Sequence, residues 1–292
     1  MGLYPNLIKT TLLLTPDITH GGQNMEFHFI DVGFGNMTLI QFPSGHTIIY
    51  DCNITYDNEK KIISYLDRIL KPHTPITVFV NSHRDADHMN GIKTLHRSHP
   101  IQKIWDSGET GTTPDSPQYR DYMEIRRLVG YAEVEAGGNT NWGDVNIKVL
   151  NSKRSDYSDP NDQSIVLKLS YKGQSMMLTG DTSFKPWKDK IVPKFSSELN
   201  STFLLASHHG SNTFFEDTSG DYYEHIRKIN PYLTIVSVGP NTWNLPDKKA
   251  LRTYDSFSRG LTNGDKVYTT QDKGIIRVLF DTDGVGRVFT NQ

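Results

Sequence analysis

The sequence predicts an α/β protein in which two mixed sheets pack face to face between outer layers of helices. Three observations support this. Strands and helices alternate along the 292 residues. Several strands are wholly apolar and rich in β-branched residues, as at 76–80, which is typical of strands buried on both faces. No repeat of fixed period or low-complexity linker divides the chain. We therefore expect one four-layer αββα sandwich over residues 25–292.

The first half of the chain begins with strands joined by tight turns. Glycine-rich and Pro-Ser-Gly turns separate the first three of these. Ile62, Leu66 and Ile69 lie on one face of a helix that Pro72 ends. We expect strands at 26–31, 37–42, 47–51, 76–80 and 101–105, and helices at 58–70, after 91, and at 119–129.

The second half alternates again, and the turn Lys172-Gly173 joins its central pair of strands. The C-terminal tail reads as a closing meander of three strands. We expect strands at 145–150, 163–171, 174–179, 202–206, 234–238, 266–270, 274–281 and 286–290, and helices at 184–196 and 247–257.

Residues 1–24 precede the domain, and their pattern does not decide between an added strand, an arm and a misassigned start. The apolar stretch 7–14 is too short to span a membrane and lacks the basic region of a signal peptide. Cys52 is the only cysteine, so no internal disulfide can form. A cytoplasmic protein without a membrane partner is expected, and no obligate protein partner is evident.

The formal net charge is −2, so overall charge does not indicate a polyanionic partner. Two local groups of basic residues stand out, one with three members near residue 100 and one with four near residue 190. They are interpreted as solvated helix faces, with guidance of a phosphate-bearing substrate as the alternative. The two groups are Lys93, Arg97 and Lys103, and Lys185, Lys188, Lys190 and Lys194.

The strongest chemical signal is the segment at 83–88, directly after a buried strand. It contains His83, Asp85, Asp87 and His88 within six residues. Imidazole and carboxylate ligands together suit Zn²⁺, Mn²⁺ or Fe²⁺. A polar surface loop with hydrogen-bonded histidines and aspartates is the alternative.

Two later strands also end in potential ligands. Residues 176–179 lead to Asp181, and residues 202–206 lead to His208 and His209. If these strand ends meet at one cleft, the carboxylates would repel each other unless a divalent cation lies between them. This favours a metal centre over a merely polar loop.

These segments together resemble the metallo-β-lactamase superfamily, and within it the domain at the end of the DNA-uptake protein ComEC. The resemblance covers residues 25–280, and each segment alone is weakly specific whereas their order is highly specific. In chain order the matching segments are 29–33, 43–45, 48–51, 82–88, 161–167, 178–181, 208–211, 237–241 and 268–270.

The resemblance implies two divalent metal ions, Zn²⁺ or Mn²⁺. His83, Asp85 and Asp181 would hold one ion. Asp87, His88, Asp181 and His208 would hold the other, so Asp181 would bridge. Asp85 stands where most of the family has histidine, and Asn161 stands where many relatives have a third histidine. Asn161 is therefore expected to be a weak metal or substrate contact, and the His83 side to be the weaker site.

Other residues receive supporting roles by the same resemblance. Asp31 and Asp51 are expected to brace the metal loop rather than bind metal. The family often has a histidine before a late proline, but here that segment is Asn244-Leu245-Pro246. His209 is the replacement candidate for general acid, with a structural role as its alternative. Ser211 and Asn212 are expected to bind an anionic oxygen or, alternatively, to cap a helix.

The predicted activity is hydrolysis by a metal-activated hydroxide, with Asp87 taking up or orienting the proton of the attacking water. A phosphodiesterase or nuclease acting on single-stranded DNA is favoured. Aromatic side chains could stack on bases, although core packing is the preferred interpretation for most of them. The alternatives are a hydrolase of small phosphoesters or lactones, and a metal-binding protein without turnover.

Overall fold

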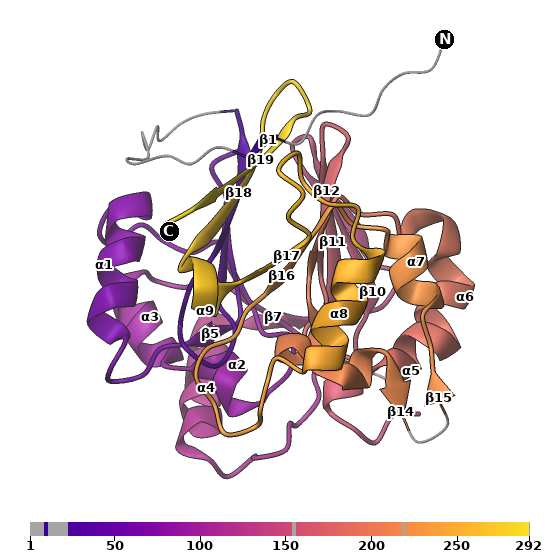
Figure 1. The fold of residues 1–292 in the computed structure, drawn as a ribbon. Helices are drawn as coiled ribbons and strands as arrows, with labels where there is room; N and C mark the ends of the chain where they lie inside the picture. Colours follow the sequence, from indigo (N-terminus) through magenta and orange to yellow (C-terminus); the bar gives the residue numbers. More distant parts are fainter. Residues whose placement is uncertain (1–8, 11–22, 154–155, 218–219, 292) are drawn as a thin grey trace.

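The computed structural model describes residues 9–10, 23–153, 156–217 and 220–291. Two large mixed sheets lie face to face at its centre, with helices on both outer sides (Figure 1). The four-layer architecture predicted from the sequence is confirmed. Lys9 and Thr10 form an edge strand, whereas the rest of the N-terminal segment to residue 22 lies outside the described residues.

The first sheet is antiparallel around β2, β3 and β4 and parallel from β4 through β6 and β7 to β8. Its outer face is covered by α1 (Glu59–Leu70), α3 (Ile92–Ser98) and α4 (Pro117–Val129). Its strand order is β1 (Lys9–Thr10), β19 (Gly286–Thr290), β18 (Ile276–Phe280), β2 (Met25–Phe29), β3 (Thr38–Gln41), β4 (Thr47–Tyr50), β6 (Val78–Val80), β7 (Ile104–Asp106) and β8 (Tyr131–Glu133).

The second sheet is parallel where β12, β13, β16 and β17 lie side by side. Its outer face is covered by α5 (Phe184–Pro186), α6 (Val192–Phe195), α7 (Glu224–Ile229) and α8 (Lys248–Phe257). Its strand order is β17 (Val267–Thr269), β16 (Leu233–Val236), β13 (Phe203–Leu205), β12 (Gln174–Leu178), β11 (Val166–Tyr171), β10 (Val145–Asn151) and β9 (Asn139–Trp142).

Short elements fill the connections. They are β5 (Cys52–Asn53), α2 (Ala86–Met89), α9 (Thr270–Lys273) and the hairpin of β14 (Glu216–Asp217) with β15 (Gly220–Asp221), together with single helical turns at Asn161–Gln163, Ser196–Glu198, Ser207–Gly210 and Asn212–Phe214. None of the helices in the described residues has the length and apolar character needed to cross a bilayer.

The helix expected at 184–196 is present, and it contains a wider π-type turn at Trp187–Ile191, next to Pro186 and Pro193, which have no N–H to donate. One sequence prediction about the elements was wrong. The three C-terminal strands do not form one meander. β17 pairs with β16 in the second sheet, whereas β18 and β19 form a hairpin in the first.

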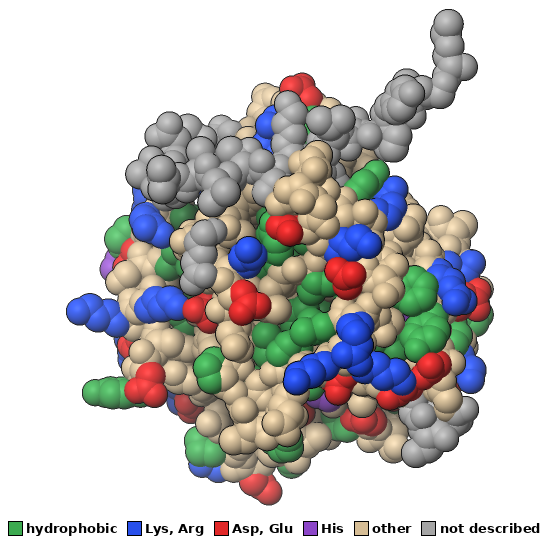
Figure 2. Space-filling model, in the orientation of Figure 1, with side chains coloured by type: hydrophobic (Ala, Val, Ile, Leu, Met, Phe, Trp, Pro, Cys, Tyr) green, Lys and Arg blue, Asp and Glu red, His purple; other side chains and the backbone are tan. Residues whose placement is uncertain are grey.

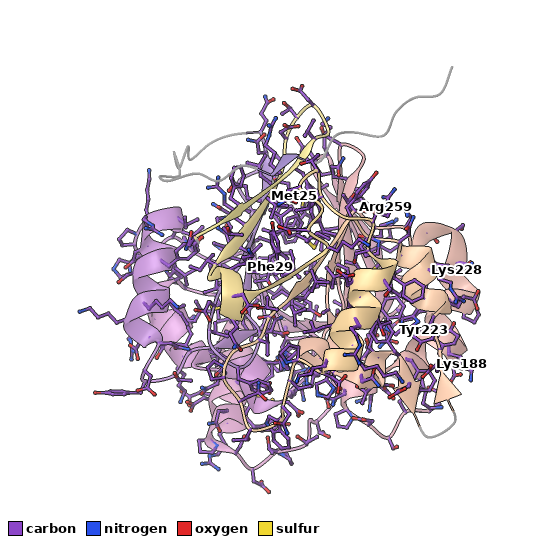
Figure 3. All side chains as sticks on the ribbon, in the orientation of Figure 1. Met25, Phe29, Lys188, Tyr223, Lys228 and Arg259 are labelled. Atoms are coloured by element: carbon purple, nitrogen blue, oxygen red, sulfur yellow. The ribbon has the colours of Figure 1, made fainter. Side chains whose placement is uncertain are left out.

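The main core lies between the sheets. Met25 and Phe29 point into it from β2, as Figure 3 shows, and both are fully buried. Phe203 of the second sheet stacks on Phe280 of the first at a centroid distance of 5.7 Å. Rings of this size bury much of the apolar area that stabilises a two-sheet core. The packing holds the two sheets rigidly enough for loops from both to build one site.

A second, outer core contains His225 of α7, which lies in a cage of aromatic rings. Tyr222 stacks on it at 5.1 Å, Phe214 meets it edge-on at 4.3 Å, and Trp187 lies 5.7 Å away. Within the described part of the chain, neither ring nitrogen has a hydrogen-bond partner of normal geometry. Burial therefore lowers the pKa of His225 to about 3, opposed only by the backbone of Phe214.

The lowered pKa predicts that His225 destabilises the fold in acid. The unfolded chain takes up a proton near pH 6.5 and the folded chain does not, so stability falls as pH drops below 6.5. Between pH 7.5 and 5, the metal-free wild type should lose about 2 kcal/mol more unfolding free energy than His225→Phe. Urea unfolding at both pH values measures this. Equal losses would mean that His225 is protonated in the folded protein.

Candidate metal centre

The loop after β6 carries the first group of potential ligands. His83 and His88 are buried, and their ring centroids lie 4.2 Å apart. Asp87 and His88 belong to α2, which lies at the lower centre of Figure 1. The loop follows the carboxyl end of β6, a short, buried and apolar strand of the first sheet.

Asp51 supports this loop from beneath. It follows β4 in the left-handed region (φ 59°), and its Oδ1 accepts a hydrogen bond of 2.7 Å from the Ser82 backbone N–H. Its Oδ2 accepts one of 2.8 Å from Nδ1 of His88. A carboxylate that holds one imidazole nitrogen leaves the other nitrogen free to face a metal. Asp51 thus orients Nε2 of His88 toward the cluster.

Asp181 lies at the centre of the cluster. Its Oδ2 is 3.3 Å from Nε2 of His88 and 3.5 Å from Nε2 of His209. The corresponding distances to Nε2 of His208 and His83 are 3.8 and 3.9 Å. Four imidazoles from two sheets therefore surround one carboxylate oxygen.

The turn that delivers Asp181 requires Gly180. This glycine has φ +54°, and a Cβ atom on it would lie 2.7 Å from Cβ of Ser164. The hydroxyl of Ser164 also accepts a hydrogen bond of 3.2 Å from the Asp181 backbone N–H. A side chain at position 180 would therefore displace the central carboxylate.

His208 and His209 follow β13, both in the left-handed region with φ of 50° and 53°. Nδ1 of His209 donates to the Ser237 carbonyl at 2.9 Å, which turns Nε2 toward Asp87 at 3.1 Å and His88 at 3.2 Å. His208 lies on the open side with 30% of its side chain exposed. The geometry therefore favours His209 as a metal ligand. The sequence had predicted that role for His208. Both assignments stay predictions.

Charges in the cluster stabilise one another. Burial alone would raise the pKa of Asp181, but His88, His209 and His208 hold it well below its usual range. Burial would likewise lower the pKa of His88, yet Asp181, Asp51 and Asp87 raise it strongly. For His208, burial is the dominant effect and its pKa is lowered. Without metal, the site is therefore expected to contain ion pairs between protonated histidine and ionised aspartate. Metal binding would release the histidine protons.

The donor set fits divalent metals. Two groups of potential ligands are close enough to share an ion, namely His83, His88 and Asp181, and Asp87, His88 and His209. Nε2 of His83 is buried without a hydrogen-bond partner in the described residues, as expected of a ligand atom. The sulfur of Cys52 donates to the Asn90 carbonyl instead, so the groups offer only nitrogen and oxygen. Such donors suit Zn²⁺ or Mn²⁺.

Asp85 is oriented by a residue that the sequence analysis missed. Thr112 donates to its Oδ1 twice, from the backbone N–H at 3.1 Å and from Oγ1 at 2.7 Å. This leaves Oδ2 of Asp85 to face Nε2 of His83 at 3.7 Å. Nothing in the sequence near Thr112 indicates this, because the contact joins two loops 27 residues apart.

Loss of this orientation should weaken the His83 side of the centre. Thr112→Val removes the hydroxyl donor, and we expect its affinity for the weaker Mn²⁺ ion to fall about 10-fold, within the range for residues that orient ligands. Thr112→Ser keeps the donor and should bind like wild type. Calorimetric Mn²⁺ titration of the three proteins measures this, and equal affinity of Thr112→Val and Thr112→Ser would contradict it.

A buried ion network supports the same loop at Arg84. Nη2 of Arg84 donates to Oδ2 of Asp106 at 2.9 Å, and Nε of Arg126 donates to the same oxygen at 2.6 Å. The hydroxyl of Tyr122 adds a third donor at 2.7 Å, and Glu109 accepts from the Arg84 backbone N–H at 2.7 Å. The network fixes the residue between His83 and Asp85.

The remaining predicted site residues lie around this centre. Asp31 contacts the Gly33 backbone N–H and Lys61, so these contacts do not support a bracing role. Ser211 caps the turn at 212–214 by accepting from the Thr213 backbone N–H, which is the alternative considered from the sequence. Asn212 donates to Glu216. Oδ1 of Asn161 is buried without a partner among the described residues, and its role stays a prediction.

A four-layer αββα sandwich with histidines and carboxylates gathered at its strand ends is the architecture of a metal-dependent hydrolase class. The chain belongs to the metallo-β-lactamase superfamily, whose family model matches residues 30–218. This is a family of metal-dependent hydrolases. The resemblance found in the sequence is thereby confirmed.

Curated relatives include three from bacterial competence and recombination. The chain is 24% identical to Recombination protein 2 of Haemophilus influenzae over 259 residues, 87% of this chain and 29% of that protein. It is 24% identical to ComE operon protein 3 of Bacillus subtilis, over 84% of this chain and 32% of that protein. Competence protein ComA of Neisseria gonorrhoeae is 26% identical over 209 residues. The chain thus spans about a third of the length of these relatives.

Solved structures support the fold alone. The metallo-β-lactamase fold protein YhfI of Bacillus subtilis superposes with a TM-score of 0.54 at 14% identity, over 87% of this chain and 99% of that one. The metallo hydrolase Igni18 of Ignicoccus hospitalis gives 0.51 at 12% identity, over 87% and 98%. CmlA, a diiron β-hydroxylase of Streptomyces venezuelae, gives 0.53 at 11% identity, over 89% and 54%.

Proposed function

We propose that the protein is a two-metal phosphodiesterase whose substrate is a nucleic acid, with single-stranded DNA favoured. The observation that carries this is the convergence of four imidazoles on one oxygen of Asp181, with Asp85 and Asp87 beside them. A carboxylate at the centre of such a set is suited to bridging two cations. Relatives named for competence and recombination favour nucleic acid among phosphodiesters.

The residues divide into two metal groups around Asp181. His83 and Asp85 would hold one ion with it, and Asp87, His88 and His209 would hold the other. When bound, two divalent cations lower the pKa of a water between them and neutralise charge on the phosphoryl oxygens. Asp51 and Ser237 keep the free nitrogens of His88 and His209 directed inward. These contacts supply the rigid geometry that the chemistry requires.

His208 has a different position from His209. Its side chain is partly exposed on the open side of Asp181, and Oγ1 of Thr213 lies 3.5 Å from its Nδ1. Because its pKa is lowered, it is neutral at pH 7 and can donate one ring proton in a hydrogen bond. We propose that His208 contacts a phosphoryl or leaving oxygen. His209, which the sequence indicated as the general acid, would instead be a metal ligand.

Metal analysis combined with a substrate panel tests the proposal. Wild type should bind close to two ions per chain and hydrolyse bis-p-nitrophenyl phosphate and labelled single-stranded DNA with Mn²⁺ or Zn²⁺. His209→Ala should lose metal, whereas His208→Ala should keep metal and lose turnover. Less than one ion per chain with no turnover contradicts the proposal. Hydrolysis confined to phosphorylcholine esters or lactones, or metal binding without any turnover, would assign the alternative functions.

A further inference from the structure

Trp243 is a solvent-exposed aromatic side chain on a loop that contacts the metal centre at one end. Its exposed fraction is 73%, although most large apolar side chains of the protein are buried. It belongs to the loop between β16, whose end provides the Ser237 carbonyl for His209, and α8. A single exposed apolar residue is common and needs no explanation by itself. Trp243 differs from such residues in two respects, because its loop is braced by hydrogen bonds and unpaired cations lie on the helix that follows.

One side chain closes the loop and fixes its shape. Nδ2 of Asn241 donates to the carbonyls of Gly239 and Leu245 at 2.8 and 2.7 Å. Its Oδ1 accepts from the backbone N–H groups of Trp243 and Leu245 at 2.9 and 3.1 Å. The ring is therefore presented on a braced turn, which lowers the entropy lost when a ligand packs against it.

The loop is anchored at both ends, and one of these anchors lies next to the metal centre. The Asp247 backbone N–H donates to the Gly210 carbonyl at 2.9 Å, directly after His209. A Cβ on Gly210 would lie 2.8 Å from Cβ of Pro246, and one on Gly239 would lie 2.4 Å from the Gly33 carbonyl carbon. Four residues of chain span at most about 14 Å, so Trp243 lies within that distance of the Asp247 attachment.

Unpaired positive charge continues from this loop onto α8. Lys248 and Arg252 are exposed and four residues apart, so they lie on one face of the helix. In the described ranges neither has an acidic partner within ion-pair distance. Four of the seven basic residues singled out from the sequence differ in this respect, because each of them pairs with an acidic residue: Lys93, Arg97, Lys185 and Lys190. Figure 2 shows Lys and Arg side chains gathered over the position of α8.

An exposed aromatic ring beside a row of cations matches single-stranded nucleic acid, whose bases stack and whose phosphates are anionic. Resting on the proposed function, we infer that Trp243, Lys248 and Arg252 form a binding track for a single strand entering the metal centre. Trp243 stacks on a base, and the two cations contact phosphates on either side of α8's first turn.

Kinetics with three substrates test this inference. Trp243→Ala should raise KM for a labelled single-stranded oligodeoxynucleotide about 10-fold, within the range for loss of one stacked base. It should leave KM unchanged for an abasic oligonucleotide with the same phosphates, and for bis-p-nitrophenyl phosphate. The double variant Lys248→Ala/Arg252→Ala should raise KM for both oligonucleotides and reduce their salt dependence. Tyr56→Ala is the matched control, because Tyr56 is another exposed aromatic ring and lies ahead of α1 on the opposite outer layer.

The outcomes separate this inference from the proposed function. Absence of bis-p-nitrophenyl phosphate turnover in wild type would overturn the phosphodiesterase itself. Normal turnover with an unchanged oligonucleotide KM in Trp243→Ala would overturn the binding track alone. A change in sedimentation of Trp243→Ala with unchanged kinetics would assign the ring to a protein contact, which also overturns the inference.

Discussion

Asp181→Asn is expected to lower phosphodiester hydrolysis by at least about 100-fold, the upper end of what even residues outside the coordination sphere reach. Oδ2 of Asp181 lies within 4 Å of Nε2 of all four imidazoles, which no other carboxylate oxygen of the described residues does, so it is placed to serve both metal groups. Asparagine keeps the shape but removes the negative charge that two cations share. The rate constant kcat/KM for bis-p-nitrophenyl phosphate at saturating Mn²⁺ measures the loss.

Metal content distinguishes a lost bridge from a disturbed fold. The variant should retain less than two ions per chain while its circular dichroism spectrum matches that of wild type. Asp144→Asn is a suitable control, because Asp144 pairs with Lys172 on an exposed turn of the second sheet. It should change neither metal content nor rate. Two ions per chain and a wild-type rate in Asp181→Asn would remove Asp181 from the proposed centre.

The sequence predicted that these side chains meet because three apolar strands each end in histidine or aspartate. The carboxyl ends of the parallel strands β6, β12 and β13 do meet, and they bring His83, Asp181 and His209 together. Such convergence is a property of the topology, so it follows from strand order once the sheets are identified. The ends of buried strands are therefore the part of this site most accessible to sequence reasoning.

The sequence could not distinguish the two adjacent histidines. Both follow the same strand, and periodicity has no meaning within a turn where both residues have positive φ. The difference arises from Ser237, whose carbonyl accepts from Nδ1 of His209 across 28 positions. Thr112 and Asp106 were missed for the same reason, since their contacts to the metal loop depend on loop conformations that residue pattern does not specify.

For Trp243, the sequence pattern also did not indicate whether the side chain is buried or exposed. An aromatic residue among prolines and asparagines is most often packed against the core, and that interpretation was preferred for most aromatic residues of this chain. Phe214, Phe215 and Tyr222 follow it. Trp243 does not; it is exposed on a loop whose shape is held by the four hydrogen bonds of Asn241. Such a loop conformation depends on polar contacts, which a hydrophobic pattern does not reveal.

Asp106→Ala is expected to reduce the unfolding free energy of the metal-free protein by about 3–5 kcal/mol, the usual cost of removing one partner from a buried ion pair. Asp106 is the shared anion between Arg84 and Arg126, whose side chains are only 5% and 8% exposed. Both cations, together with Tyr122, hold the pKa of Asp106 low against the effect of burial. Without the carboxylate, two buried guanidinium groups face each other with only Glu133 left for Arg126.

The companion variant Arg84→Met should cost less, about 1–3 kcal/mol, because Asp106 keeps Arg126 and Tyr122 as donors. Both variants should nevertheless weaken metal binding, since Arg84 lies between His83 and Asp85 and its backbone is held by Glu109. Urea unfolding of the metal-free proteins and Mn²⁺ titration of the folded ones separate the two effects. If Arg84→Met proved as destabilising as Asp106→Ala, the shared-anion arrangement would be wrong. If neither changed metal affinity, the network would stabilise the fold without positioning the centre.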